Sequence, residues 1–327
     1  MIKLYISKGE KMLEKPPQIF SSVAPEPISK LFIEYSKYID AAPRTIETYT
    51  KALKQLNQFI VTNDIKQPTR ETIIEFRQYL EQNHKATTVQ TYLIAIRQFF
   101  KWTAQAGLYP NIADNVKGKK ISKAPKKDCL SIDEIKTILS GIDRAKPKGK
   151  RDYAIITIML TCGLRDIEVA RANIEDVRTI ESNTFIYLQG KGRDENADYV
   201  RIPSQTEAAL KDYISIRNDL KKDDPLFSSI SNNSNGSRLS TRSISRIVKQ
   251  AMRNAGYDSD RLTAHSLRHT AITLSLKNGE SLQEVQQFAR HTNINTTLIY
   301  AHNLEREQNT CSNTIANSIF LEESKEF

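Results

Sequence analysis

Four short segments of the chain carry ionisable side chains at spacings that suit chemistry on an anion. Residues 161–168 contain Gly-Leu-Arg, which ends at Arg165, and Glu168 follows one helical turn later, where it could hold the guanidinium in place. At 190–192 two glycines flank Lys191 and give its side chain reach. Taken singly, the first pattern is more often a structural ion pair, and the second a solvated lysine in a turn.

The other two segments lie nearer the C-terminus. Residues 265–269 read His-Ser-Leu-Arg-His, so His265 and Arg268 are three apart and share a helix face. A histidine and an arginine near a helix start suit an anion, whereas zinc fits poorly because no cysteine or third histidine lies at ligand spacing. The last segment begins with His291 and ends with Tyr300 across a polar loop, and nothing local marks this tyrosine as a nucleophile.

Together these side chains form a set for phosphoryl transfer without a metal or another cofactor. Two arginines can hold the non-bridging oxygens of a phosphodiester and neutralise the charge of a pentavalent state. A lysine can protonate the leaving 5′ oxygen, and histidines can accept the tyrosine proton or hydrogen-bond an oxygen. A tyrosine has a free pKa of about 10, so it needs such help to attack as a phenolate.

The sequence around these segments predicts the elements that must position them. From Pro27 to Leu108 apolar residues recur at spacings of three and four, which predicts four helices in a compact all-α domain. Pro43 lies at the start of one helix, Thr69 can cap another, and Gly107 ends a third.

The C-terminal part mixes helices with a hairpin. Ser131 reads as a helix cap, with acidic residues in the first turn after it. Residues 153–162 are strongly apolar and predict a buried helix. The other predicted elements are strands at Thr184–Gln189 and Asp198–Ile202, helices at Thr206–Asn218 and Thr241–Ala255, and further helices to the end of the chain.

Length and charge set the broad organisation. The 327 residues suit about two domains, and the formal charge of +10 suits a polyanionic partner, nucleic acid first, although many basic proteins bind nothing anionic. Residues 113–127 hold six lysines against one aspartate and predict a basic linker. We expect an N-terminal extension at 1–26, a helical DNA-binding domain at 27–110, the linker at 111–128, a catalytic domain at 129–310 and a C-terminal tail at 311–327.

Seven basic residues in the helical domain and the linker are candidate DNA contacts. The linker lysines could lie along phosphates or simply keep the tether soluble. For any one helical position, an ordinary solvated side chain is the commoner interpretation. The seven are Arg44, Lys51, Lys85, Arg97, Lys101, Lys119 and Lys120.

The sequence also favours a soluble protein of the cytoplasm. The sequence holds no run of about 18 apolar residues, the length needed to cross a membrane. Its first 17 residues lack the apolar core of a secretion signal. Cys129, Cys162 and Cys311 are too few and too scattered for a disulfide framework, so we expect reduced, packed cysteines.

In order and spacing, the four segments resemble the active-site signature of the tyrosine recombinases, the family of Xer recombinases, Cre and phage integrases. The resemblance covers about residues 27–305. It implies a role for each matching residue. Arg165 and Arg268 would clamp the scissile phosphate, and His291 would hydrogen-bond it. Lys191 would be the general acid, and His265 would assist proton transfer. Tyr300 would form a 3′-phosphotyrosine bond, and Glu168 would be a supporting residue.

The resemblance also implies the fold and the assembly. The fold would be mainly α with a small antiparallel β-sheet: an all-α core-binding domain followed by an α+β catalytic domain. Four protomers would assemble on two sites in double-stranded DNA and exchange strands through a Holliday junction, without metal or ATP. A C-terminal apolar stripe would pack into a neighbouring protomer or fold back on its own domain. The stripe consists of Ile315, Ile319 and Phe320.

Two departures from the family pattern stand out. The family usually has Leu-Gly before the third-segment histidine, and here the pair is Ala289-Arg290, which we expect to alter packing rather than chemistry. Residues 193–195, Arg-Asp-Glu, make the hairpin tip more acidic than usual.

Two other functions remain open on the sequence. A type IB-like DNA topoisomerase shares the tyrosine, arginine, lysine and histidine chemistry but needs no paired sites, and a compact helical N-domain favours the recombinase. A catalytically idle DNA-binding protein is the third hypothesis, and the complete residue set argues against it. The biological task is either integration and excision of a mobile element, which we favour, or Xer-like chromosome resolution, with an accessory or directionality factor as a further partner.

Overall fold

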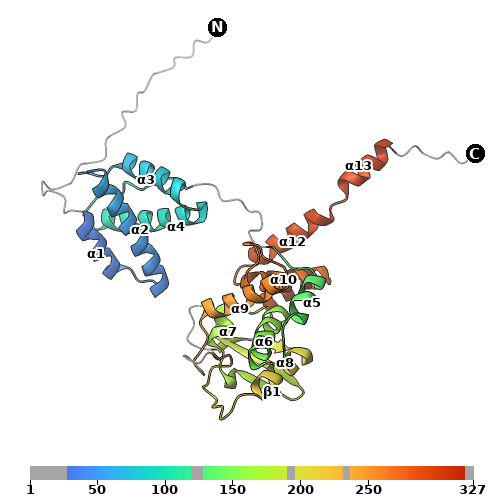
Figure 1. Ribbon diagram of the computed structural model, residues 1–327. Helices are drawn as coiled ribbons and strands as arrows, with labels where there is room; N and C mark the ends of the chain where they lie inside the picture. Colours follow the sequence, from blue (N-terminus) through green and yellow to red (C-terminus); the bar gives the residue numbers. More distant parts are fainter. Residues whose placement is uncertain (1–27, 119–127, 190–195, 231–235, 321–327) are drawn as a thin grey trace, which may run out of the picture. The chain divides into compact units, whose positions relative to one another are not determined.

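The computed structural model describes residues 28–118, 128–189, 196–230 and 236–320 (Figure 1). The chain divides into two compact units, an N-terminal unit at residues 1–123 and a C-terminal unit at residues 124–327. The division falls inside the stretch 111–128, for which the sequence predicts a linker.

The regular elements in the described part of the N-terminal unit are helices, as predicted. Its apolar stripes meet in one core that includes Leu56, Phe76 and Phe99, which are fully buried. Tyr35 and Phe32 add rings around Phe99, with centroids 5.5 and 4.7 Å away. The helices are α1 Ile28–Tyr38, α2 Pro43–Thr62, α3 Arg70–Asn83 and α4 Ala86–Gln105.

The predicted start and stop signals act in these helices. Pro43 is the first residue of α2, where its missing N–H costs nothing. Thr69 is the N-cap residue of α3, and its backbone N–H donates to the hydroxyl of Thr72 at 3.1 Å. Gly107 follows α4 with φ +70°, a conformation that favours glycine.

The first part of the predicted linker packs against the N-terminal core. Ala113 and Val116 are buried there, and Arg77 donates from Nη1 to the carbonyl of Lys117 at 2.9 Å. The linker sequence has no apolar period, so this packing could not be predicted from its pattern. Residues 119–127 lie outside the described residues.

The C-terminal unit surrounds one apolar helix, as predicted from residues 153–162. This helix, α6, contacts helices on several sides and is buried at Ile155, Ile156, Ile158 and Met159 (Figure 1). The helical elements are α5 Ile132–Ser140, α6 Pro147–Thr161, α7 Asp166–Arg171, the 3-10 turn η1 Ile174–Asp176, α8 Ser204–Ile214, α9 Thr241–Asn254, α10 Ala264–Lys277, α11 Leu282–Ala289, α12 Asn295–Gln308 and α13 Cys311–Phe320.

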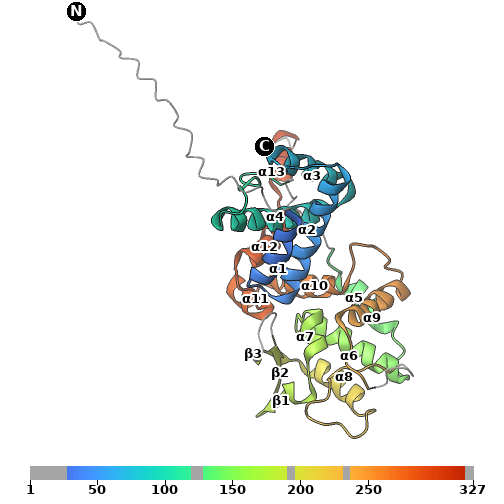
Figure 2. The ribbon, with the colours of Figure 1, turned by 90° about the vertical axis from the view of Figure 1, so that its left-hand side faces the viewer.

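A small antiparallel sheet lies beside α7 in this unit (Figure 2). Its strands β1 Val177–Ile180, β2 Asn183–Gln189 and β3 Asn196–Ile202 pair in the order β1-β2-β3. Tyr187 pairs with Tyr199 in the hairpin, and side chains along β2 alternate between buried and partly exposed. The hairpin was predicted, whereas β1 was not.

These elements confirm the predicted fold class, mainly α with a small antiparallel sheet. Within the described ranges, no helix is long and apolar enough to span a membrane. The same ranges hold no cluster of three or more histidine, cysteine, aspartate or glutamate side chains that could bind a metal ion.

Candidate active site

The first predicted segment leaves the core where α6 ends. Gly163 follows α6 with φ +58°, and a Cβ at this position would lie 2.9 Å from ring atoms of Phe288. Both facts require glycine, because other residues are strained in this conformation and the space is already filled. The turn brings Arg165 to the N-cap of α7, with its side chain 31% exposed.

Glu168 holds Arg165, as the one-turn spacing predicts. Its carboxylate is almost fully buried and accepts from Nη1 of Arg165 at 2.7 Å and from the backbone N–H of Arg165 at 2.8 Å. Burial alone would raise the pKa of Glu168, but the charges of Arg290 and Arg165 and their hydrogen bonds bring it below its usual value. The carboxylate is therefore ionised at neutral pH.

Arg268 connects the other segments to the first. It lies on α10, is 2% exposed, and donates from its two Nη atoms to the carbonyls of Gly163 and Ala289. One carbonyl belongs to the first segment and the other directly precedes the Arg290-His291 pair of the last. Burial, then the charges of Arg165 and Arg290, lower the pKa of Arg268 to about 9, so it still carries its charge at neutral pH.

The last segment places His291 and Tyr300 side by side. Their rings are stacked with centroids 6.3 Å apart, and Nδ1 of His291 bonds to the hydroxyl of buried Thr297 at 2.9 Å. Burial, followed by the charges of Arg268, Arg165 and other neighbours, lowers the pKa of His291 to about 4. The ring is therefore neutral at physiological pH.

Tyr300 is a neutral phenol in this arrangement. It lies on α12 and packs against a small apolar cluster that includes Ile272 and Val285. Burial raises the pKa of Tyr300 to about 12, although the charges of Arg268 and Arg165 act in the opposite direction. Reaction as a phenolate would need a base and the nearby positive charge.

A histidine that the sequence analysis left without a role links His265 to this tyrosine. His269 follows His265 by one turn of α10, and their rings are 4.6 Å apart. The ring of His269 is also 5.0 Å from that of Tyr300. The spacing of four between the two histidines was the available signal, because such residues share a helix face.

Arg290 is the second residue that sequence reasoning missed. Its side chain is 6% exposed, and its Nη2 donates to Oε2 of Glu168 at 2.8 Å and to the carbonyl of Gly163 at 3.0 Å. The charge cluster (Arg165, Glu168, Arg268 and Arg290) therefore combines three positive groups with one negative group. Its net charge of +2 (three minus one) suits an anion.

Comparison with known proteins identifies the chain. A model described as the phage integrase family matches residues 128–307, and one described as the phage integrase N-terminal SAM-like domain matches residues 28–108. The chain belongs to the phage integrase family of tyrosine recombinases. Its enzyme class is that of the tyrosine site-specific recombinases.

Individual relatives of this recombinase agree with the family match. Tyrosine recombinase slr0733 of Synechocystis sp. is 27% identical over 293 residues, 84% of this chain and 91% of that protein. Tyrosine recombinase XerD of Staphylococcus saprophyticus is 30% identical over 281 residues, 82% of this chain and 92% of that protein. The XerH site-specific recombinase, solved bound to its palindromic difH substrate after cleavage, shares the fold. It has a TM-score of 0.67 at 22% identity and covers 87% of this chain and 84% of that chain.

The remaining predicted residues of the recombinase belong to the N-terminal unit or lie outside the described residues. Lys191, Lys119 and Lys120 lie outside the described residues, as does the acidic hairpin tip. Arg44 and Lys51 both pair with Glu47 on the surface of α2, at 2.8 and 2.6 Å. The other candidates lie at or in α4: exposed Lys85 and Lys101, and partly buried Arg97. DNA contact by these residues remains a prediction.

An open pocket adjoins the site of the recombinase. It has a volume of about 800 Å³ and lies between residues of β3, including Tyr199 and Arg201, and residues at the end of α11. His291 and Arg290 are among its lining residues. His291, whose Nδ1 is engaged by Thr297, therefore borders an open space as well as the phenol of Tyr300.

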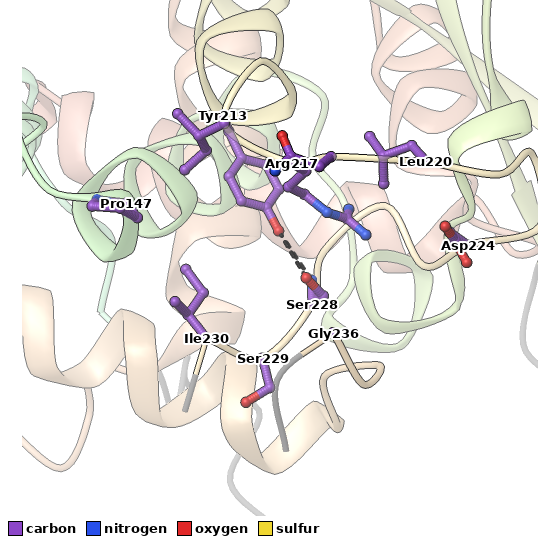
Figure 3. Close-up of a pocket in the computed structure, with 11 residues that line it drawn as sticks. Pro147, Tyr213, Arg217, Leu220, Asp224, Ser228, Ser229, Ile230 and Gly236 are labelled. Carbon is purple, nitrogen blue, oxygen red and sulfur yellow. Dashed lines mark hydrogen bonds between the residues drawn. The ribbon is translucent and has the colours of Figure 1, made fainter. Parts of the chain in front are cut away.

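A second pocket of the same unit has a structural explanation (Figure 3). Its volume is about 450 Å³, and the hydroxyls of Tyr213 and Ser228 are 3.3 Å apart on its wall. Arg217 donates to the carbonyls of Pro225 and Leu226 at 2.8 and 2.9 Å. The bond between Tyr213 and Ser228 ties the loop after α8 to the helix, and the bonds of Arg217 hold two parts of that loop together. The predicted catalytic residues that the structure describes do not line this pocket.

Proposed function

We propose that this recombinase cuts and rejoins double-stranded DNA through a covalent 3′-phosphotyrosine bond at Tyr300. The observation that supports this most strongly is the position of Arg268. Its guanidinium bonds to the carbonyls of Gly163 and Ala289, and its charge acts on the pKa of Tyr300. Segments that are more than a hundred residues apart thereby border a single positively charged site.

The proposed cleavage step is a transesterification. The phenol oxygen of Tyr300 attacks the scissile phosphorus as the bond from phosphorus to the 5′ oxygen breaks. The proton of the phenol passes to His265, next to His269, and Lys191 protonates the departing 5′ oxygen. Arg165 and Arg268 offset the charge on the non-bridging oxygens.

Rejoining reverses the same step with another strand. A 5′ hydroxyl from the partner duplex attacks the phosphotyrosine, a new phosphodiester forms, and the phenol of Tyr300 is released with a proton. The tyrosine ester conserves the energy of the broken phosphodiester, so no ATP is needed. We infer exchange of two strand pairs through a Holliday junction by a tetramer on two DNA sites.

The neutral His291 fits a hydrogen-bonding role in this step. A pKa of about 4 leaves it uncharged at neutral pH, and its Nδ1 is occupied by Thr297. A contact with the phosphate would therefore use Nε2 as a donor. The positive charge of the cluster comes from the arginines alone.

The biological task is either movement of a genetic element, by integration and excision, or Xer-like resolution of chromosomes. The relatives are named as Xer recombinases, which supports the second task as much as the first. Recombination of a plasmid carrying two copies of the DNA that flanks the gene, compared with one carrying chromosomal resolution sites, separates the two. An accessory or directionality factor would be required if the purified protein recombines neither plasmid but a cell extract restores the reaction.

The central test uses a nicked suicide substrate made from the native flanking DNA. The wild type should give a covalent protein–DNA adduct on a denaturing gel, while Tyr300→Phe should bind the DNA and give none. Tyr257→Phe, a change of the same kind elsewhere in the C-terminal unit, should react as the wild type does. An adduct that persists in Tyr300→Phe would identify a different nucleophile.

Two further measurements separate this function from the alternatives. Joint products between two duplexes indicate a recombinase, whereas relaxation of supercoiled DNA without joint products indicates a type IB-like topoisomerase. Binding without any adduct in the wild type would indicate a catalytically idle DNA-binding protein.

Binding should weaken steeply as salt rises, because bound basic residues release counterions from the DNA.

A further inference from the structure

Arg290 occupies a backbone position that favours glycine. It follows α11 with φ +52° and ψ +48°, in the left-handed region where a side chain is disfavoured. The family pattern usually has glycine here, which would adopt this conformation without strain. A residue with a long, charged side chain therefore needs a compensating interaction.

The side chain of Arg290 finds that interaction inside the active site. Its Nη1 donates to the carbonyl of Phe288 at 2.7 Å, and its Nη2 donates to Gly163 and Glu168. The Nε atom is buried without a hydrogen-bond partner. A group that only filled space here would not need a charge, because an unpaired polar atom is costly to bury.

Arg290 and Arg165 share the same carboxylate. Oε1 of Glu168 accepts from Nη1 of Arg165 at 2.7 Å, while Oε2 accepts from Nη2 of Arg290 at 2.8 Å. Arg165 also donates from Nη2 to the backbone carbonyl of Arg290 at 3.3 Å. Both the side chain and the backbone of Arg290 therefore fix where the guanidinium of Arg165 lies.

The shared carboxylate also decides how much positive charge Arg165 keeps. With Glu168 as its sole neighbour, Arg165 would belong to a neutral pair. With Arg290 bound to the same carboxylate, the group of three carries a net charge of +1 (two minus one). A phosphate at the partly exposed Arg165 then meets an uncompensated cation.

We propose that Arg290 is a positioning residue of the recombinase site, which orients Arg165 and balances Glu168 so that Arg165 keeps its charge for the scissile phosphate. This inference rests on the proposed function. It replaces the expectation that the Ala289-Arg290 departure affects packing alone. Arg290 acts through Arg165 and Glu168 and is therefore a positioning residue, not a catalytic one; its two Nη atoms are bound to Glu168 and to backbone carbonyls.

The test compares three variants of the full-length protein on the nicked suicide substrate. Arg290→Gly suits the left-handed backbone and should stay folded. It should nevertheless form the adduct about tenfold to a hundredfold more slowly, as is typical when a residue that supports an active-site group is lost. Arg290→Met should be slowed to a similar extent. Arg290→Lys retains the charge without the fork and should recover part of the rate.

The rate per folded molecule distinguishes positioning from a merely structural role. A purely structural role would lower the amount of folded protein, followed by circular dichroism, and would leave the rate of each folded molecule unchanged. After burial, the charge of Arg290 is also one of those that lower the pKa of His291. Its removal should let this pKa rise in Arg290→Gly and leave it close to wild type in Arg290→Lys, which an NMR titration of the ring measures.

The matched control is Arg151→Met, which removes another buried arginine of the C-terminal unit. Arg151 is bound to Asp152 and to the carbonyl of Ser228, so its loss should affect stability and leave the rate per folded molecule unchanged. The inference is overturned if Arg290→Gly forms the adduct at the wild-type rate per folded molecule. It is also overturned if Arg290→Lys forms the adduct no faster than Arg290→Met. This second comparison tests the inference even if the glycine variant folds poorly. Failure of the proposed function is distinct, because the wild type itself would then form no adduct.

Discussion

The N-terminal unit and the C-terminal unit are built around different cores. In residues 28–118 the buried polar residues are the uncharged Thr72 and Thr103, and the centre is an aromatic cluster around Phe99. In the C-terminal unit an apolar core adjoins the charge cluster, where Glu168 and Arg268 are almost fully buried. One core is held mainly by apolar contacts, and the other also buries ionised groups.

This difference indicates which parts of the molecule serve stability and which serve chemistry. Apolar burial stabilises a fold without requiring precise partners, whereas a buried charge is costly unless every donor and acceptor is matched. The carbonyls of Gly163 and Ala289 provide the match for Arg268. An arrangement of this cost is expected where the charge has a task, and that task is the one proposed for the scissile phosphate.

The largest expected effect is on the N-terminal core. Phe76→Ala removes a fully buried ring whose centroid lies 5.3 Å from that of Phe59. It should lower the free energy of unfolding of this unit by about 3–5 kcal/mol. Trp102 is the chain's single tryptophan and packs against Tyr35, so its fluorescence during denaturant unfolding reports on this unit. Under conditions where the variant is folded and DNA is saturating, adduct formation should keep its wild-type rate. A slowed chemical step would break the comparison.

Arg268→Met should slow the chemical step and leave the stability of the N-terminal unit unchanged. It removes the cation that connects the segments, and adduct formation should slow by about 10²–10³-fold, the effect of losing one preorganised charge-stabilising donor. Single-turnover cleavage of the suicide substrate measures this rate. Unfolding of the N-terminal unit, followed through Trp102, should match wild type. Wild-type cleavage by this variant would mean that the buried charge serves structure alone.

The sequence predicted the elements of both units better than it predicted their contacts. Helix periodicity and the residues Thr69 and Ser131 placed helix starts, because these signals are local. The strand β1 was missed because four residues have too little pattern, and its pairing depends on β2. The packing of Ala113 against the N-terminal core was missed because the linker sequence has no apolar period.

The candidate site shows the same limit at the level of single residues. The four segments were recognised from their residue types and order, and the one-turn pair of Arg165 and Glu168 was read correctly. Arg290 could not be assigned, because its partner Glu168 is 122 residues away and only the fold brings them together. The neutral state of His291 likewise depends on its burial and then on the charges of Arg268 and Arg165, which only the fold brings near it.

Gly163→Ala should lower stability by less than Phe76→Ala and should also slow cleavage. Its control, Gly107→Ala, lies in the N-terminal unit. The new methyl group would meet the ring of Phe288 in a left-handed backbone, so we expect a loss of about 1–3 kcal/mol in stability. The carbonyl that binds Arg268 and Arg290 would shift as well, and cleavage should slow. Gly107→Ala is the matched control, because its φ is +70° but nothing lies within 4 Å of its Cβ position. Equal losses in both variants, without slower cleavage, would show that crowding at Gly163 has no consequence for the site.

The smallest expected effect is the pH dependence that His291 gives to the C-terminal unit. In an unfolded chain this ring takes up a proton near pH 6.5, whereas in the folded protein its pKa is about 4. Between these values the unfolded state binds more protons, so stability present at neutral pH is lost as the pH falls from about 6.5 towards 4. The ring is only half-buried, so solvent screening should keep this loss well below that of Phe76→Ala.

His291→Asn should flatten the change in melting temperature between pH 6.5 and 4, followed by the circular dichroism of the helices. Glu168 contributes a change of its own only at the acid end of this window, below about pH 5. Its folded pKa lies below its ordinary value, so its contribution is present above that value and is lost as the pH falls through the folded pKa. The transition of the N-terminal unit, followed through Trp102, should be unchanged by His291→Asn at every pH. An identical pH slope in the variant and the wild type would mean that the charge cluster does not hold this histidine in its neutral form, and the contrast between the two cores would then lie in packing rather than in electrostatics.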